Sequence, residues 1–194
     1  MGGNVTRALQ RLRDGVVALA ILALALLIVA KLENEQAQRF AGPFAVIDGD
    51  TLTADGKRLR IEGVDAPELG QSCTSEEGTS YACGEDARRA LSGLVSAGRW
   101  ECSGTSRDRY DRLLVICKRG VDDLGRLLVA AGAAVANGRY LSAEAEARQF
   151  KRGIWAGRFD RPSDWRRMRK MEEAELAGWV GALLPEWISR WFGE

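Results

Sequence analysis

Histidine is absent from all 194 residues of this chain. Its absence excludes histidine as a general base or nucleophile, and it excludes zinc sites with histidine ligands. A strong charge imbalance is also missing, because 28 Lys and Arg side chains stand against 27 Asp and Glu side chains, a net charge of +1. Overall charge therefore gives no reason to expect a polyanionic partner, and any attraction to nucleic acid must come from a local patch.

Cysteine is scarce, with four residues and no C-x-x-C pair, so we do not expect a zinc site. An even number favours disulfides in an exported domain, and four buried free thiols are the alternative. Cys102 and Cys117 fall on the two arms of a predicted hairpin, and Cys73 and Cys83 bound one loop. We therefore expect the disulfides Cys73–Cys83 and Cys102–Cys117.

A charge-free apolar run of 16 residues extends from Gly15 to Ala30, with arginines before it and Lys31 after it. This is a little short for a membrane span of ~20 residues, but Leu32 and snorkelling basic side chains can extend it. We expect residues 1–14 in the cytoplasm, a transmembrane signal anchor at 15–32, and the remainder on the periplasmic side of the inner membrane. A cleaved signal peptide, which would make the protein secreted, and a buried soluble helix are the alternatives.

Residues 33–39 are polar, so we expect a linker at 33–41, and short apolar runs separated by turn signals follow. Strands are expected at 45–47, 52–53, 57–64, 99–103 and 112–118, with a hairpin turn at Asp55-Gly56. Helices are expected at 85–98, 124–131 and 142–152. Strands first, with helices interleaved late, predict a small α+β domain.

Two of the apolar runs end in carboxylates, in Asp48-Gly49-Asp50 and in Asp65-Ala66-Pro67-Glu68. The first motif alone is more often a turn than a metal site. Carboxylates at strand ends nevertheless suit a Ca²⁺-type ion, and Arg60, five residues before Asp65, suits a neighbouring phosphate. Together with the segment 108–112, D-R-Y-D-R, the set is typical of a metal-dependent phosphodiesterase.

These motifs resemble the staphylococcal nuclease-like (thermonuclease) family. The matching elements are I-D-G-D-T at 47–51, R-x-x-x-x-D-x-P-E at 60–68, D-R-Y-x-R at 108–112 and the closing helix with its Gly-Ile-Trp ending at 141–157. The resemblance covers about residues 42–166. It implies a five-stranded OB-type Greek-key β-barrel with packed helices.

The resemblance also implies catalytic and metal-binding roles. The implied catalytic residues are Arg60, Glu68 and Arg112, and the implied Ca²⁺ ligands are Asp50, Asp65 and the backbone carbonyl of Ala66. In this assignment the two arginines bind the scissile phosphate and the glutamate holds or deprotonates the attacking water. Removing either arginine should lower the rate by about 10²–10³ or more.

Substrate contacts are implied for Arg109 and Tyr110, which would meet a neighbouring phosphate or sugar. Tyr140 is a further candidate contact, with packing beneath the closing helix as the alternative. Asp111 stands where the family usually has glycine or asparagine. Aspartate tolerates a left-handed turn, but its charge could pair with Arg112 and weaken phosphate binding.

The resemblance implies a Ca²⁺-dependent nuclease acting on DNA and RNA with low sequence specificity, which cuts the bond to the 5′ oxygen and leaves 3′-phosphates. The alternative is a non-catalytic module of the same barrel that binds nucleic acid or protein. A membrane-bound scaffold is a third class, and it would leave Asp50, Arg60 and Glu68 without a purpose. No obligate protein partner is evident.

The resemblance ends after Trp165, and residues 167–194 form an amphipathic, tryptophan-rich extension. Its aromatic residues suit a membrane interface or a partner groove. Docking of a C-terminal helix on its own domain, and disorder, are the alternatives.

Overall fold

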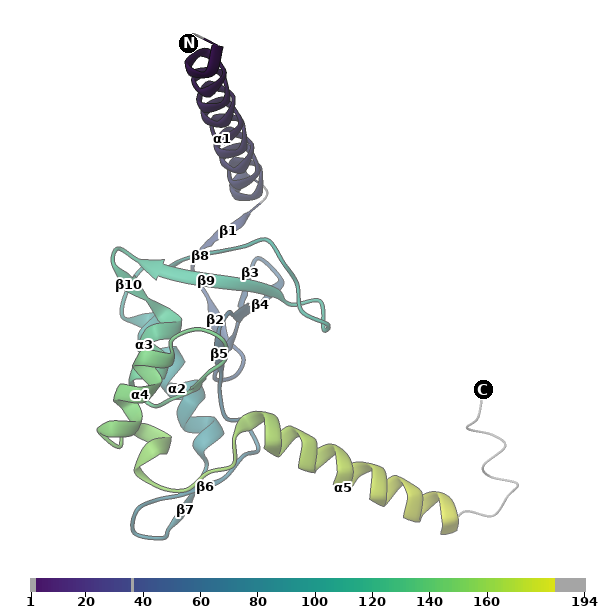
Figure 1. The fold of residues 1–194 in the computed structure, drawn as a ribbon. Helices are drawn as coiled ribbons and strands as arrows, with labels where there is room; N and C mark the ends of the chain where they lie inside the picture. Colours follow the sequence, from purple (N-terminus) through teal and green to yellow (C-terminus); the bar gives the residue numbers. More distant parts are fainter. Residues whose placement is uncertain (1–2, 36, 184–194) are drawn as a thin grey trace.

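The main sheet has seven strands in a computed structural model that describes residues 3–35 and 37–183 (Figure 1). Its strand order is β1 (Gln38–Ala41), β8 (Glu101–Gly104), β9 (Leu113–Arg119), β4 (Lys57–Ile61), β3 (Thr51–Ala54) and β2 (Ala45–Val46), and β10 (Asp122–Asp123) pairs with β9. Neighbouring strands are antiparallel except β4 and β9, which run parallel. Two small pairs lie outside this sheet, β5 (Val64–Asp65) with β11 (Val135–Ala136) and β6 (Cys73–Thr74) with β7 (Ser80–Tyr81).

Three helices pack beside the sheet: α2 (Cys83–Ser96), α3 (Leu124–Ala130) and α4 (Leu141–Gln149), the last followed by the 3₁₀ turn η1 (Gly153–Ala156). The Asp123 carboxylate caps α3 by accepting a hydrogen bond of 3.1 Å from the Arg126 amide. The helix α5 (Pro162–Leu183) leads away from this body, and α1 (Gly3–Glu35) enters at the opposite end. The α+β architecture predicted from the sequence is confirmed, and its curled sheet with packed helices fits the OB-type fold.

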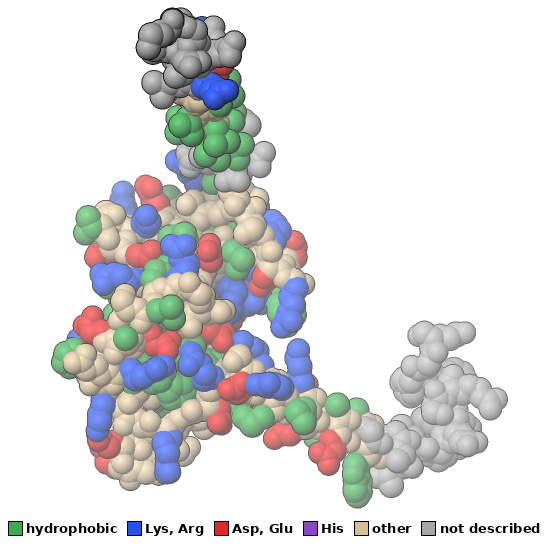
Figure 2. All heavy atoms as spheres, in the orientation of Figure 1, with side chains coloured by type: hydrophobic (Ala, Val, Ile, Leu, Met, Phe, Trp, Pro, Cys, Tyr) green, Lys and Arg blue, Asp and Glu red, His purple; other side chains and the backbone are tan. Residues whose placement is uncertain are grey.

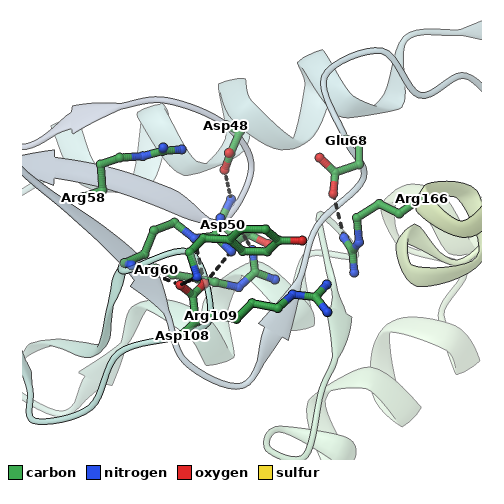
Figure 3. A pocket seen from close by; sticks show the side chains of 10 residues that line it. Asp48, Asp50, Arg58, Arg60, Glu68, Asp108, Arg109 and Arg166 are labelled. Atoms are coloured by element: carbon green, nitrogen blue, oxygen red, sulfur yellow. Dashed lines mark hydrogen bonds and ion pairs between the residues drawn. The ribbon is translucent and has the colours of Figure 1, made fainter. Parts of the chain in front are cut away.

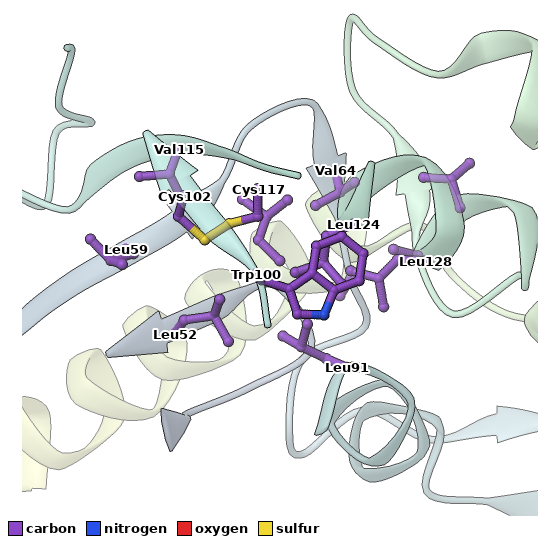
Figure 4. Close-up of a cluster of buried hydrophobic side chains, with 14 of the residues drawn as sticks. Leu52, Leu59, Val64, Leu91, Trp100, Cys102, Val115, Cys117, Leu124 and Leu128 are labelled. Carbon is purple, nitrogen blue, oxygen red and sulfur yellow. A yellow bond between two sulfur atoms is a disulfide. The ribbon is translucent and has the colours of Figure 1, made fainter. Parts of the chain in front are cut away.

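The core lies between the sheet and the helices and is centred on Trp100, which is 1% exposed (Figure 4). Leucines from β3, β4, α2 and α3 surround it, and the Cys102–Cys117 disulfide joins paired positions of β8 and β9. A second disulfide, Cys73–Cys83, ties β6 to the start of α2. Both predicted pairings are therefore confirmed.

The hairpin between β3 and β4 positions the later site. Asp55 and Gly56 both have positive φ, 50° and 72°, as a tight two-residue hairpin turn requires. The turn sets a register in which Thr51 lies opposite Arg60. Asp50, which directly precedes β3, therefore lies close to Arg60 on β4.

Two predicted boundaries differ from the structure. Residues 38–41 form the edge strand β1 instead of part of a linker, because Phe40 is apolar and buried (5% exposed) opposite Cys102. With β1 and β10, the sheet has seven strands instead of the five expected. At the other end, α5 runs through the expected boundary between residues 166 and 167 without interruption.

The predicted transmembrane anchor at 15–32 is not supported. Within residues 3–35 and 37–183, no helix combines the length and the apolar character that crossing a membrane requires. The charge-free run of 16 residues is itself shorter than the ~20 residues of a typical span. The aromatic tail predicted to bind a membrane or partner lies largely at 184–194, outside the described residues.

Candidate active site

Most of the predicted site residues line one pocket of about 630 Å³ (Figure 3), here called the active-site pocket. Its lining residues are Asp48, Asp50, Arg58, Arg60, Glu68, Asp108, Arg109, Tyr110, Arg112 and Arg166. They come from the turn before β3, from β4, from the segment after β5, from the loop before β9 and from α5. Residues distant in sequence thus converge on one cleft.

One guanidinium holds the two predicted metal-binding carboxylates together. Arg60 Nη1 lies 2.6 Å from Asp50 Oδ1, and Arg60 Nη2 lies 3.1 Å from Asp65 Oδ1. The carboxylates are nearly buried, with 6% of each side chain exposed, and the arginine side chain is 15% exposed. Because breaking a buried pair leaves an uncompensated charge, this bridge fixes β3, β4 and β5 relative to one another.

Asp50 is the most strongly perturbed acid of the site. Burial raises its pKa from 3.8 to about 6, and the nearby Asp48 adds to the rise. Arg60 opposes this effect, as do hydrogen bonds from the Ala66 amide (3.2 Å) and the Thr51 hydroxyl (3.0 Å). A second cation near Asp50 would favour its charged form.

The predicted phosphate-binding Arg112 is held by Asp108 and Thr51. Its Nε donates to Asp108 Oδ2 at 2.8 Å, and its Nη1 lies 3.3 Å from the Thr51 hydroxyl oxygen. Burial opposes the charged form of Asp108, but its hydrogen bonds with Arg112 and the Tyr110 amide outweigh burial and lower its pKa. The carboxylate therefore stays ionised and orients the guanidinium toward the pocket.

The loop before β9 presents Arg109 and Tyr110 at the pocket rim. The Arg109 guanidinium lies 4.8 Å from the centre of the Tyr110 ring, and that of Arg112 lies 5.4 Å from the same ring. Asp111 adopts the left-handed conformation (φ 60°), but the predicted pairing with Arg112 is wrong. Its carboxylate pairs instead with Arg107, at 3.2 Å on the exposed side of the turn.

Arg166 is a site residue that the motifs missed. From α5, its Nη1 lies 2.6 Å from Glu68 Oε1 and 3.0 Å from Asp65 Oδ1, and its Nη2 lies 3.0 Å from Asp65 Oδ2. Burial works against its charge, but these hydrogen bonds raise its pKa above the ordinary value. The available sequence signal was the basic cluster around residues 158–170, which has no motif linking it to Asp65 and Glu68.

Tyr140 does not line the active-site pocket. It begins α4 in a left-handed conformation (φ 62°), and its ring packs against α3, where a Cβ added to Gly125 would lie 2.7 Å from the ring. Burial and a hydrogen bond with Asp123 raise the pKa of Tyr140 to about 12. The structure therefore favours packing over the predicted substrate contact.

The oxygen donors for a cation are few. Across residues 3–35 and 37–183, no group of three or more His, Cys, Asp or Glu side chains is arranged to hold a metal ion. Asp50 and Asp65 nevertheless converge on Arg60, and the Ala66 backbone lies beside Asp50. The two carboxylates suit a hard divalent ion that takes its remaining ligands from water and do not suit a soft metal, and the Ala66 atom that lies beside Asp50 is its amide nitrogen.

Residues 58–157 match the family described as staphylococcal nuclease homologue. The succinoglycan biosynthesis protein ExoI of Rhizobium meliloti (strain 1021) is 39% identical over 126 residues, which cover 61% of this chain and 66% of that relative, just under two thirds of its length. An uncharacterized endonuclease of Haemophilus influenzae (strain ATCC 51907 / DSM 11121 / KW20 / Rd) is 30% identical over 141 residues, which cover 66% of this chain and 74% of that relative. The chain belongs to the family of staphylococcal nuclease homologues. Its domain is a nuclease domain, of the class that hydrolyses phosphodiester bonds.

Proposed function

We propose that this protein cleaves DNA and RNA with little sequence preference in a Ca²⁺-dependent reaction. The observation that carries the proposal is the convergence of Arg60, Arg112 and Glu68 in one pocket with the acids Asp50 and Asp65 beneath it. Guanidinium groups are suited to bind phosphate oxygens, and a carboxylate is suited to position water. Both requirements of phosphodiester hydrolysis are met by side chains of this chain.

In this mechanism, the N–H groups of Arg60 and Arg112 that face the pocket bind the non-bridging oxygens of the scissile phosphate. They stabilise the negative charge that grows on these oxygens in the transition state. Glu68 accepts a hydrogen bond from the attacking water and takes its proton. Arg166 Nη1, at 2.6 Å from Glu68 Oε1, fixes the position of this carboxylate until the water arrives.

Asp50, Asp65 and the Ala66 carbonyl would hold Ca²⁺, which would supply positive charge beside the same phosphate oxygens. The support is the all-oxygen character of this set and the raised pKa of Asp50, about 6, because a buried acid of this kind is stabilised in its charged form by a cation. Family resemblance adds the expected products, which are 3′-phosphates from cleavage of the bond to the 5′ oxygen.

We place the domain outside the cytoplasm, because its two disulfides require an oxidising compartment. Attachment to the inner membrane through the N-terminal segment stays a prediction. A mass map of the protein from its native host, alkylated before lysis, tests the location. Intact disulfides are expected, and four free thiols would contradict an extracytoplasmic site.

The activity test uses the full-length protein with single-stranded DNA, duplex DNA and RNA, in Ca²⁺ and in EDTA. We expect cleavage in Ca²⁺ that is lost in EDTA and in Glu68→Gln, and retained in the matched control Glu62→Gln. Glu62 suits as a control because it pairs with Arg139 at 3.7 Å and lies outside the pocket lining. End-group analysis of the fragments should show 3′-phosphates.

The same experiment distinguishes the nuclease from the alternative, a non-catalytic module that binds nucleic acid. Folded wild-type protein that binds oligonucleotides without cutting them in Ca²⁺ would reject the enzyme and favour a binding module. Cleavage that persists in Glu68→Gln would reject the role proposed for this carboxylate.

A further inference from the structure

A second groove adjoins the active-site pocket, between the loop before β9 and α5. This α5 groove has a volume of about 470 Å³, and its lining residues are Arg109, Ser163, Arg166, Arg167, Lys170, Met171 and Ala174. Six of these residues come from α5. Their positions, 163, 166, 167, 170, 171 and 174, repeat every three or four residues, so they share one face of the helix. All of this helix lies beyond the family match at 58–157, so one wall of the groove is an addition to the matched domain, and Arg109 supplies the other.

The groove continues the active-site pocket. Arg109 and Arg166 line both cavities. Figure 3 shows their side chains extending toward the same space from opposite sides, one from the loop and one from α5. A chain-like ligand with one unit in the active-site pocket therefore has a direct path into the groove.

The charges in the groove are of one sign. Four of its seven lining residues are Arg or Lys, and none is acidic. Arg167 pairs with Asp164 on its own helix but keeps 70% of its side chain exposed, and Arg166 is 34% exposed. This local concentration contrasts with the net charge of +1 for the whole chain. It forms the positive patch that overall composition did not indicate.

The remainder of α5 is balanced in charge. Arg169 lies outside the groove and has Glu172 and Glu173 within 4 Å, at 3.9 and 3.6 Å. A helix designed to lie on an anionic membrane would carry its cations on an outward face without acids beside them. Here Arg166, Arg167 and Lys170 lie on the helix face that lines the groove beside the active-site pocket, which favours a ligand shared with that pocket.

We propose that the α5 groove binds the phosphates of a single nucleic-acid strand adjacent to the nucleotide that is cleaved. This inference rests on the proposed nuclease function. Arg166 and Lys170 are one helical turn apart, about 6 Å along the axis, comparable to one nucleotide of an extended strand. Binding through phosphates also agrees with low sequence preference, because phosphate contacts carry no direct base information.

The test measures binding without turnover, so that it does not depend on activity. Full-length protein carrying Glu68→Gln is titrated in EDTA with a fluorescent dinucleotide, a long single strand and its duplex, at several salt concentrations. Arg167→Ala/Lys170→Ala is compared in this background with Arg169→Ala, a control on the same helix. We expect the double variant to weaken binding of the long single strand and to flatten the slope of log Kd against log salt by about 1.4, for two lost phosphate contacts.

The outcomes separate the two proposals. If the double variant and Arg169→Ala weakened binding of the long single strand equally, the proposed role of the groove would be wrong. It would also be wrong if the double variant weakened binding of the duplex alone. Loss of dinucleotide binding to the same extent as long-strand binding would also overturn it, because the groove lies beyond the cleaved position. A groove effect in a wild-type protein that fails to cut DNA would leave the binding site established and reject only the enzyme.

Discussion

The two sides of the active-site pocket are held in different ways. On the strand side, Arg60 bridges Asp50 and Asp65 with little exposure of any of the three side chains. On the helix side, Arg166 reaches Glu68 from α5, and each of these two side chains is 34% exposed. Buried pairs are costly to break, whereas exposed pairs are screened by solvent. The strand side is therefore part of the folded framework, whereas Glu68 on the helix side can exchange its partner without unfolding, because Arg166 keeps its second contact with Asp65.

Removing Arg60 should break the strand side and give the largest effect. Arg60→Ala leaves the nearly buried Asp50 without its cation and leaves Asp65 with Arg166 alone, so we expect the free energy of unfolding to fall by about 3–5 kcal/mol. The cleavage rate of the remaining folded protein should fall by at least about 10²–10³. Urea denaturation and initial rates measure both effects. Arg89→Ala on α2, which removes an exposed pair with Asp86, is the control and should cost under about 1 kcal/mol.

Asp50, on the strand side, should make the protein less stable as pH rises, the reverse of the usual effect of a paired carboxylate. Since the pKa of Asp50 is about 6 in the folded protein and its ordinary value is 3.8, the folded state binds the extra proton between these pH values. In EDTA, the free energy of unfolding should therefore fall as pH rises from 4 to 6, by roughly 2–3 kcal/mol from this group. Thermal unfolding of wild type and Asp50→Asn tests this, because the variant should lose this component.

Removing Arg166 should lower stability less than removing Arg60 does, and it should strengthen cation binding. Arg166→Ala removes the exposed pair with Glu68, and Asp65 keeps Arg60 as a partner at 3.1 Å, so we expect a cost of about 1 kcal/mol. Asp65 and Glu68 then lose a competing guanidinium, and Ca²⁺ should bind more tightly by calorimetry. Weaker Ca²⁺ binding, or destabilisation as large as that of Arg60→Ala, would contradict the distinction between the two sides.

The smallest effect is expected at Asp111. Because its carboxylate pairs with Arg107 and not with Arg112, Asp111→Asn should leave the cleavage rate unchanged within about twofold. Asparagine keeps the left-handed conformation that this position requires. A large gain in rate would show that the Asp111 charge acts on the phosphate-binding arginine after all.

Local sequence signals predicted much of the fold and most of the pocket. Turn chemistry at Asp55-Gly56 located a hairpin that the structure contains. Cysteine positions on the two hairpin arms predicted the pairing that the structure shows. The edge strand β1 was missed because it is short and polar on one face, so that only the burial of Phe40 against β8 identifies it.

The roles of Tyr140 and Arg166 depended on contacts across the fold. A tyrosine before a helix has the same local pattern whether it packs on a neighbouring helix or meets a substrate, and only the approach of α3 decides between them. Arg166 lies 101 residues from Asp65 in sequence, and its contacts depend on the direction in which α5 leaves the domain.

The amino-acid sequence by itself determined the family, the hairpin, the disulfide pairs and the residue types of the site, because each is encoded in short-range spacing and composition. Only the tertiary structure decided which charges meet: Arg60 between two acids, Arg112 on Asp108 and Arg166 on Glu68. Electrostatic pairing depends on distance and burial in space, and neither quantity is set by separation along the chain.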